Sequence, residues 1–449
     1  MIRGSLSALL KLHRGSLTSA SPSGPRRTFQ TGKFDDSNVN PVAVQMIDYA
    51  TSLARSMKSD ESYAEGMLVL EQCLSSSSSM DESGVVSVDN SKGMVLLAMS
   101  DLLFARGKYG DAMDKLQRIR QLTNASMGVR VAAMEALVGI NLQLGDDDTA
   151  SVVADKCLEL WENHHDMSGL EEVHVRAKTL KGYVELARGN AKSGTKDISC
   201  LFWLQFIASH FVNGVFIFVA MCYFEQMKAD DVNFGASALA YGEILHVSSH
   251  LSEAKIIYQN VMEETSKVKE LRSINSLSAC NMERRETLLA ATCALGQLET
   301  LLGDFDVAES TLTKALNEAE QTYGCRHPKI GVVLACLALM FRQKDRAGHP
   351  SSLLIQEGLY RRAAELLNIP PLDSHDAMIC SMKDIAAIVR GGYADVLGIQ
   401  RNREAEAEKM KTWAECAWTN SATSLTGVLN GGDTLSKAPV IDSRICRVL

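Results

Sequence analysis

Apolar and polar positions alternate along most of the chain in a pattern of short helices that come in pairs. In residues 94–122, one apolar stretch leads to a Gly-Lys-Tyr turn, and a second stretch carries a small residue near its start. This unit is defined by Met99, Leu103, Gly107, Tyr109, Ala112, Leu116 and Ile119. Apolar residues three and four positions apart lie on one face of an α-helix. The pattern therefore predicts an all-α chain of antiparallel helix pairs.

The same unit recurs in residues 134–160, 238–261 and 292–319, and residues 178–189 supply a further first helix. Three classes of residue define the unit. Small residues, which we expect where paired helices approach closely, are Ala112, Ala150, Gly242, Ala254, Gly296 and Ala308. Aromatic residues, which we expect to fill the space between pairs, are Tyr109, Tyr258 and Phe305. Glycines expected to end the first helix with a positive φ are Gly107, Gly145 and Gly303. One pair cannot bury its own apolar face, so neighbouring pairs must stack.

These residues resemble the tetratricopeptide repeat, with a small residue, a turn glycine, an aromatic two positions later and an alanine three after that. The spacing from Gly303 to its equivalent, Asp345, is similar to the longer repeat of kinesin light chains. The whole chain looks like the large set of plant organelle tetratricopeptide-like proteins. The resemblance implies a helical-hairpin solenoid, a right-handed superhelix of antiparallel pairs.

The repeats divide the chain into five predicted regions. A leader covers residues 1–34, and helical repeats cover 40–197 and 225–418. Residues 198–224 interrupt them. The tail 419–449 is rich in Gly, Ser and Thr, and we expect it to be flexible.

Residues 1–34 have the composition of an organelle transit peptide. They carry six basic residues and many serines, and the first carboxylate is Asp35. Arg27-Thr28-Phe29 is similar to the site that mitochondrial processing proteases cut. We therefore expect a mitochondrial location, with the chloroplast as the alternative. A basic disordered tail is the simpler interpretation.

Residues 198–224 form an apolar stretch without a formal charge, and they are rich in phenylalanine: Phe202, Phe206, Phe211, Phe216 and Phe218. Removing residues 198–223 restores a repeat of ordinary length, which indicates an insertion or a gene-model artefact. The stretch is also long enough to cross a bilayer as a helix. A buried core helix is the third interpretation.

Composition narrows the classes of function. A hydrophobic fraction of 46% excludes global disorder, and a net charge of −8 argues against a surface that tracks phosphates. The 11 cysteines are odd in number and contain no Cys-x-x-Cys, so neither a disulfide framework nor a zinc knuckle is indicated.

Motifs for catalysis or metal binding are weak. His246 and His250 are separated by one helical turn, but the predicted helix ends at Ser249 and no third ligand follows. The Asp146-Asp147-Asp148 run lacks the alternating ligands of a calcium loop. No phosphate loop, Gly-x-Ser-x-Gly or His-Glu-x-x-His motif occurs. We therefore predict no catalytic, cofactor-binding or metal-binding residues and no enzyme.

The expected function is a non-enzymatic scaffold or assembly factor that binds a protein partner on its concave face. The candidate concave residues are Leu97, Asp101, Phe104, Glu135, Tyr183 and Leu245. Leu97, Asp101 and Glu135 stand where chaperone-type repeats carry Lys and Asn, so a carboxylate clamp is not predicted. A membrane-anchored adaptor, held by residues 198–224, is one alternative. A helical-repeat RNA-binding protein is another, although the acidity argues against nucleic acid as a partner.

Overall fold

The computed structural model divides the chain into Met1–Lys33 and Phe34–Leu449. It describes parts of the second unit only. The described residues are 39–76, 85–162, 171–189, 235–267, 274–349, 353–372, 382–400, 402–420, 423–431 and 438–449. The predicted leader 1–34 and the apolar segment 198–224 lie outside this part of the chain, so their interpretations stay predictions.

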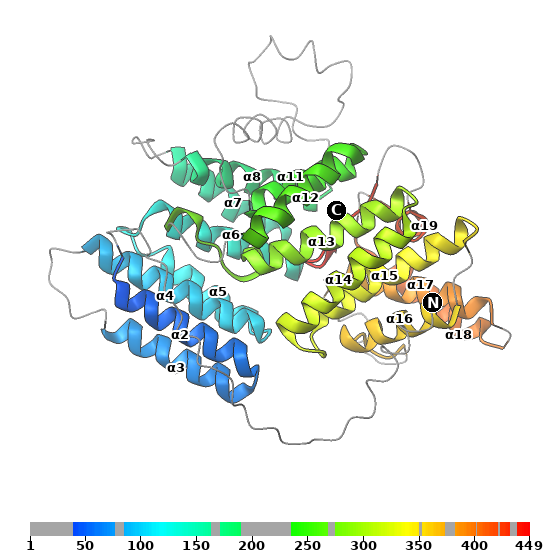
Figure 1. Cartoon of the computed structure of the whole chain (residues 1–449), viewed down its shortest axis with the longest axis horizontal. Helices are drawn as coiled ribbons and strands as arrows, with labels where there is room; N and C mark the ends of the chain where they lie inside the picture. Colours follow the sequence, from blue (N-terminus) through cyan, green and yellow to red (C-terminus); the bar gives the residue numbers. More distant parts are fainter. Residues whose placement is uncertain are drawn as a thin grey trace, which may run out of the picture. The chain divides into compact units, whose positions relative to one another are not determined.

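The described residues are mainly helical, which confirms the all-α prediction (Figure 1). In chain order the first helices are α2 (Pro41–Met57), α3 (Asp60–Ser76), α4 (Val85–Ala105), α5 (Tyr109–Ile119), α6 (Met127–Leu144), α7 (Asp147–Glu162) and α8 (Glu171–Ala187). After the gap come α11 (Gly235–Val247), α12 (Leu251–Lys267), α13 (Arg284–Leu301), α14 (Phe305–Tyr323), α15 (Pro328–Arg346), α16 (Leu353–Leu366), α17 (Lys383–Gly398), α18 (Glu404–Ala417) and α19 (Leu425–Asn430). Two 3₁₀ turns, η2 (Ile274–Ser276) and η3 (Cys280–Met282), and two strands, β1 (Ile441–Asp442) and β2 (Arg447–Val448), complete the described elements.

The helices pack in tandem pairs. Consecutive helices form the pairs α2–α3, α4–α5, α6–α7, α11–α12, α13–α14, α15–α16 and α17–α18. The first helices of neighbouring pairs also contact one another, as α4 contacts α6, α11 contacts α13 and α13 contacts α15. Each apolar face is therefore covered both by its own partner and by the next pair.

First and second helices differ in how they are buried. In α6 every residue from Met127 to Gln143 is buried except Arg130, whereas α5 buries only Ala112, Leu116 and Ile119. A helix that is apolar on all sides belongs in a core, and an amphipathic helix belongs at a surface. The helix α6 is also the one described helix with the length and composition to cross a membrane, but 89% of that stretch is buried inside the protein.

The turn glycines lie where the pattern expects them. Gly107, Gly145 and Gly303 have φ values of +70°, +81° and +82°, and each follows a first helix. At the end of α6 the Gly145 N–H donates to the Leu142 carbonyl and the Asp146 N–H donates to the Asn141 carbonyl. This arrangement satisfies the last carbonyls of the helix, and the left-handed conformation it needs favours glycine.

Small residues allow close approach within the pairs. A Cβ on Gly242 would lie 2.7 Å from Cε1 of Tyr258, and one on Gly296 would lie 2.6 Å from Cγ of Leu312. The four alanines at the equivalent close contacts are fully buried, namely Ala112, Ala150, Ala254 and Ala308. Of the aromatic residues, Tyr258 and Phe305 are buried and Tyr109 is half-buried, its hydroxyl accepting from Gln143 Nε2 at 3.1 Å.

The region 419–449 differs from the flexible tail that its composition predicts. Residues 425–430 form α19, and residues 438–449 form a short antiparallel hairpin in which Ile441 pairs with Val448 and Asp442 with Arg447. We call residues 438–449 the β-hairpin. Its apolar side chains are buried apart from the half-buried Pro439, and Ser443 and Arg444 are buried as well. Apolar residues on both sides of a polar turn let this segment pack into the core despite its Gly- and Ser-rich approach.

Candidate functional site

The candidate concave residues lie on the first helices of the pairs and on α8, which we call the inner helices together with α13, α15 and α17. The side chains are not open to solvent. Asp101 is half-buried, and the others are buried, namely Leu97, Phe104, Glu135, Tyr183 and Leu245. Leu97 and Leu245 belong to the apolar core. Two other segments of the chain cover much of this face, so a partner could reach these side chains only where those segments leave them accessible.

The first covering segment is residues 274–282. It packs against α4, α6 and α8 through η2 and η3. Its fit on α6 is close: a Cβ on Gly139 would lie 2.2 Å from Asn281 Oδ1, and one on Gly128 would lie 2.3 Å from the Ile274 carbonyl oxygen. Glycine is needed at these two positions because the backbone and side chains of the covering segment come that near.

A buried ion pair anchors this segment. Arg176 on α8 donates from Nε to Glu135 Oε1 at 3.0 Å and from Nη2 to Glu135 Oε2 at 2.5 Å. The same guanidinium donates to the carbonyls of Asn275 at 2.5 Å and Leu277 at 2.6 Å. Glu135 thus acts as a positioning partner for an arginine that holds the main chain of residues 274–282.

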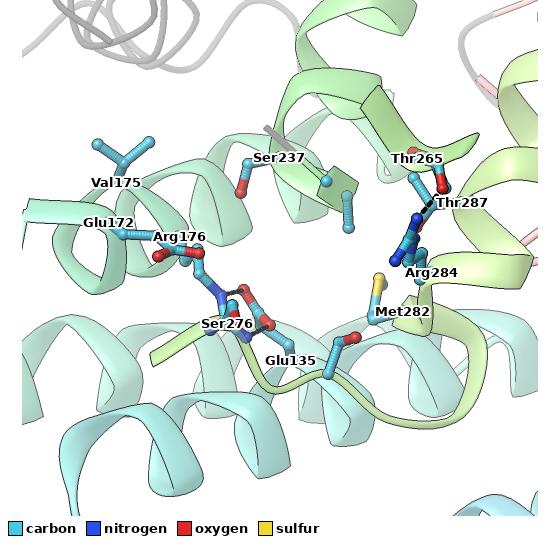
Figure 2. A pocket seen from close by; sticks show the side chains of 13 residues that line it. Glu135, Glu172, Val175, Arg176, Ser237, Thr265, Ser276, Met282, Arg284 and Thr287 are labelled. Carbon is cyan, nitrogen blue, oxygen red and sulfur yellow. Dashed lines mark hydrogen bonds and ion pairs between the residues drawn. The ribbon is translucent and has the colours of Figure 1, made fainter. Parts of the chain in front are cut away.

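Figure 2 shows the small cavity beside this ion pair. Its volume is about 90 Å³, and Glu172, Ser237, Met282 and Thr287 contribute to its wall. On the far side, Arg284 donates to the carbonyl of Thr265. Burial raises the pKa of Glu172, against the opposing effect of Arg176. Both arginines of the cavity wall already have acceptors, and the volume suits a few water molecules.

Asp101 forms a second polar contact with the covering segment. Its Oδ1 accepts the Cys280 N–H at 2.5 Å, and nearby Arg55 pairs with Glu283 at 2.9 Å. Burial, together with the Glu283 carboxylate, raises the pKa of Asp101 to about 8. This carboxyl is therefore protonated over much of the neutral range.

The second covering segment is the β-hairpin, whose Arg444 is the centre of a buried charged network. The Arg444 side chain is 1% exposed. It donates to Glu243 on α11 at 2.5 Å, to Asp442 at 2.9 Å and to the Ala236 carbonyl at 3.1 Å. Tyr183 donates from its hydroxyl to Asp442, and its ring centroid lies 4.8 Å from the guanidinium carbon.

Other inner helices hold the main chain of the β-hairpin. Gln297 on α13 donates from Nε2 to the Ile441 carbonyl at 3.0 Å and accepts the Ile441 N–H at 2.8 Å. Lys329 on α15 donates to the carbonyls of Ser443 at 3.2 Å and Arg444 at 3.4 Å, and it also pairs with Glu286. Contacts to backbone groups bind an extended segment whatever its side chains.

Acidic side chains surround the second arginine of the β-hairpin. Arg447 pairs with Asp147 at the start of α7, and its Nε lies 4.0 Å from Asp384 Oδ2 on α17. We define the hairpin site as the residues that contact the β-hairpin through these charged and polar groups: Asp147, Tyr183, Glu243, Gln297, Lys329 and Asp384.

Burial and the neighbouring charges shift the acidities of this network. Burial, assisted by Asp442, raises the pKa of Glu243 well above its usual range, although Arg444 acts in the opposite direction. Burial also acts on Asp442, but the Arg444 guanidinium outweighs it and lowers the pKa of that carboxyl. Arg444 therefore forms its ion pair with Asp442, and Glu243 accepts a hydrogen bond from the same guanidinium.

Among the predicted concave residues, Tyr183 and Phe104 reach the hairpin site. The ring centroid of Phe104 lies 5.8 Å from Lys329 Nζ. The repeat pattern does not indicate Glu243, Gln297, Lys329 or the arginines of the β-hairpin. One available signal was a lone charge in an otherwise apolar helix, because such a charge must find a partner when it is buried.

The histidine motif has a structural role. His246 is buried, and its Nδ1 lies 3.2 Å from the hydroxyl of Tyr258. Burial lowers the pKa of His246 to about 3. Ser249, with a φ of +62°, ends the turn before His250. In the described part of the chain, no three His, Cys, Asp or Glu residues gather as a metal site.

Comparisons with known proteins add no assignment. No protein-family model matches the chain, and no curated protein matches it.

Proposed function

We propose that this protein is a non-enzymatic interaction scaffold of tetratricopeptide-like repeats that binds an extended segment of a partner protein on its inner helices. The repeat pattern of Gly107, Gly145 and Gly303 supports the repeat class. The contacts between first helices of successive pairs, such as α13 with α15, support a solenoid.

One observation carries the proposal: inner helices bind the backbone of an extended segment. Gln297 pairs with both the N–H and the carbonyl of Ile441, and Lys329 donates to two further carbonyls. A side-chain amide that satisfies both groups of one residue replaces the pairing a neighbouring strand would give. The inner helices therefore hold the chemical groups needed to bind peptide main chain.

Selection from a displayed library of random peptides on the full-length protein tests the proposal. Selected peptides carrying a photoreactive group are crosslinked, and the crosslinks are mapped by mass spectrometry. We expect crosslinks on the inner helices α6, α8, α11, α13, α15 and α17. The second helices of the pairs, such as α5 and α14, are the outer helices. Crosslinks confined to outer helices, or the absence of selected peptides, would contradict the proposal.

A matched pair of glutamine variants sharpens this test. Gln297→Ala removes two main-chain hydrogen bonds, so selected peptides that use them should bind about tenfold more weakly. Gln321→Ala changes an exposed residue on the outer helix α14 and should leave the affinity unchanged. Equal affinities for the two variants would remove Gln297 from the binding surface.

The location is proposed on composition. The basic, acid-free residues 1–34 suit a mitochondrial leader, with a chloroplast leader as the alternative. A fluorescent protein fused after residue 34 should enter mitochondria. The same fusion with Arg14, Arg26 and Arg27 changed to Gln should stay outside.

A further inference from the structure

We propose that the β-hairpin is an intramolecular ligand, and that the partner competes for the hairpin site with a segment carrying two arginines three positions apart. This inference rests on the proposed function and specifies its ligand. The two arginines of the partner would take the places of Arg444 and Arg447.

Charge complementarity supports this choice of ligand. The surroundings of the β-hairpin contribute the carboxylates of Asp147 and Asp384 and the carboxyl group of Glu243, which accepts from Arg444. The ammonium group of Lys329 is already paired with Glu286. The side chains of the β-hairpin contribute two guanidinium groups, Arg444 and Arg447, and one carboxylate, Asp442. Without the β-hairpin the site keeps an excess of negative charge, so it selects a basic segment.

The two arginines are recognised at separate places. Arg444 meets Glu243 and the ring of Tyr183, whereas Arg447 meets Asp147 and lies near Asp384. Guanidinium groups suit both places because they donate several hydrogen bonds in one plane and lie well over an aromatic ring. A segment with one arginine would satisfy only one of them.

The non-covalent contacts between the β-hairpin and the hairpin site are of kinds that a competing segment can also make. Strand pairing joins Ile441 with Val448 and Asp442 with Arg447, and Val440 and Leu449 exchange two further main-chain hydrogen bonds. A two-stranded hairpin has little stability of its own. Buried ion pairs give specificity but little net stability, because desolvation offsets their attraction. A cavity of about 30 Å³, room for about one water molecule, lies beside Ile441 and Val448. A partner segment with better contacts can therefore take the place of the β-hairpin.

Fluorescence anisotropy with a labelled synthetic peptide of residues 438–449 tests the inference. The receptor is the full chain, either unchanged or carrying Arg444→Glu, which places a carboxylate opposite Glu243 and releases the β-hairpin. We expect the variant to bind the peptide about tenfold more tightly or better, since intramolecular competition lowers the apparent affinity of the unchanged chain. A peptide with both arginines replaced by glutamine should not bind.

A second experiment uses a cleavable full-length chain and does not depend on the folding of the Arg444→Glu variant. A protease site is introduced between residues 431 and 438, and the folded protein is cut. Excess peptide of residues 438–449 should then displace the cut β-hairpin, while the circular dichroism of the helices stays unchanged. A β-hairpin that cannot be exchanged, or a loss of helix on exchange, would overturn the inference.

These outcomes separate this inference from the proposed function. If library peptides crosslink to the inner helices but leave the β-hairpin in place, the scaffold proposal stands and the inference fails. If the β-hairpin exchanges and no foreign peptide is selected, the hairpin site binds only its own segment, and the scaffold proposal fails.

Discussion

The interfaces inside the helix pairs are formed by small and apolar residues, whereas the hairpin site is formed largely by charged and polar residues. Within α11–α12 and α13–α14, Gly242 faces Tyr258 and Gly296 faces Leu312 at distances that leave no room for a methyl group. Where the β-hairpin meets the hairpin site, the ionisable side chains of Arg444, Glu243 and Lys329 are buried. The first kind of interface depends on shape and the second on charge.

The two regions also differ in the distance along the chain that they bridge. Gly242 and Tyr258 lie on consecutive helices of one pair, whereas Arg444 and Glu243 are separated by 201 positions. Local apolar contacts form with small loss of chain entropy, while distant polar contacts need the rest of the fold to bring them together. The pairs therefore provide stability, and the hairpin site provides specificity.

The largest expected effect on stability comes from removing the charge of Arg444 from the β-hairpin. Arg444→Met leaves Asp442 buried without its cation and should lower the free energy of unfolding by about 3–5 kcal/mol. Arg362→Met is the matched control, because Arg362 is 49% exposed in its pair with Glu365. An exposed pair contributes about 0–1 kcal/mol. Urea unfolding measures both, and similar losses would contradict the comparison.

The second effect concerns Asp101 and pH. Its pKa is about 8 in the folded protein and 3.8 when unperturbed, so the folded state binds more protons between these values. Stability should therefore fall as pH rises from about 4 to about 8, by up to a few kcal/mol. Asp101→Asn should flatten this slope while keeping an acceptor for the Cys280 N–H. Melting temperatures measured across the window test it, and an unchanged slope would contradict the assignment.

The third prediction concerns the close approach of two helices within a pair. Gly242→Ala places a methyl group against the buried ring of Tyr258 and should cost about 1–3 kcal/mol. Gly358→Ala in α16 meets nothing within 4 Å and should stabilise by about 0.5–1 kcal/mol. Chemical denaturation gives both values. If both variants were stabilised, close approach at Gly242 would not be a constraint.

The smallest expected effect concerns the backbone conformation of the turn between α13 and α14. Gly303 has a φ of +82° and open space around it, so Gly303→Ala should cost about 1 kcal/mol through backbone strain alone. Gly110→Ala, in similarly open space without a positive φ, provides the control. Thermal melts should separate the two variants. Equal melting temperatures would show that the turn relaxes.

By itself, the sequence determined the helix pairs and their turns. Residues 292–319 predicted α13 and α14, and the spacing of Gly303, Phe305 and Ala308 placed the turn between them. Residues 134–160 likewise predicted parts of α6 and α7, with Gly145 at the turn between them. Such features depend on periodicity and on local backbone conformation, which neighbouring residues specify.

Only the tertiary structure decided what covers the inner helices. Composition predicted a flexible tail where the β-hairpin is buried, and nothing local to Asp442 or Arg444 indicates Tyr183 or Glu243 as their partners. Residues 274–282 cover Asp101 and Glu135 in the same way. Burying a charge is unfavourable unless a partner meets it, and these partners come from helices far along the chain. The candidate site was therefore beyond the reach of a local pattern.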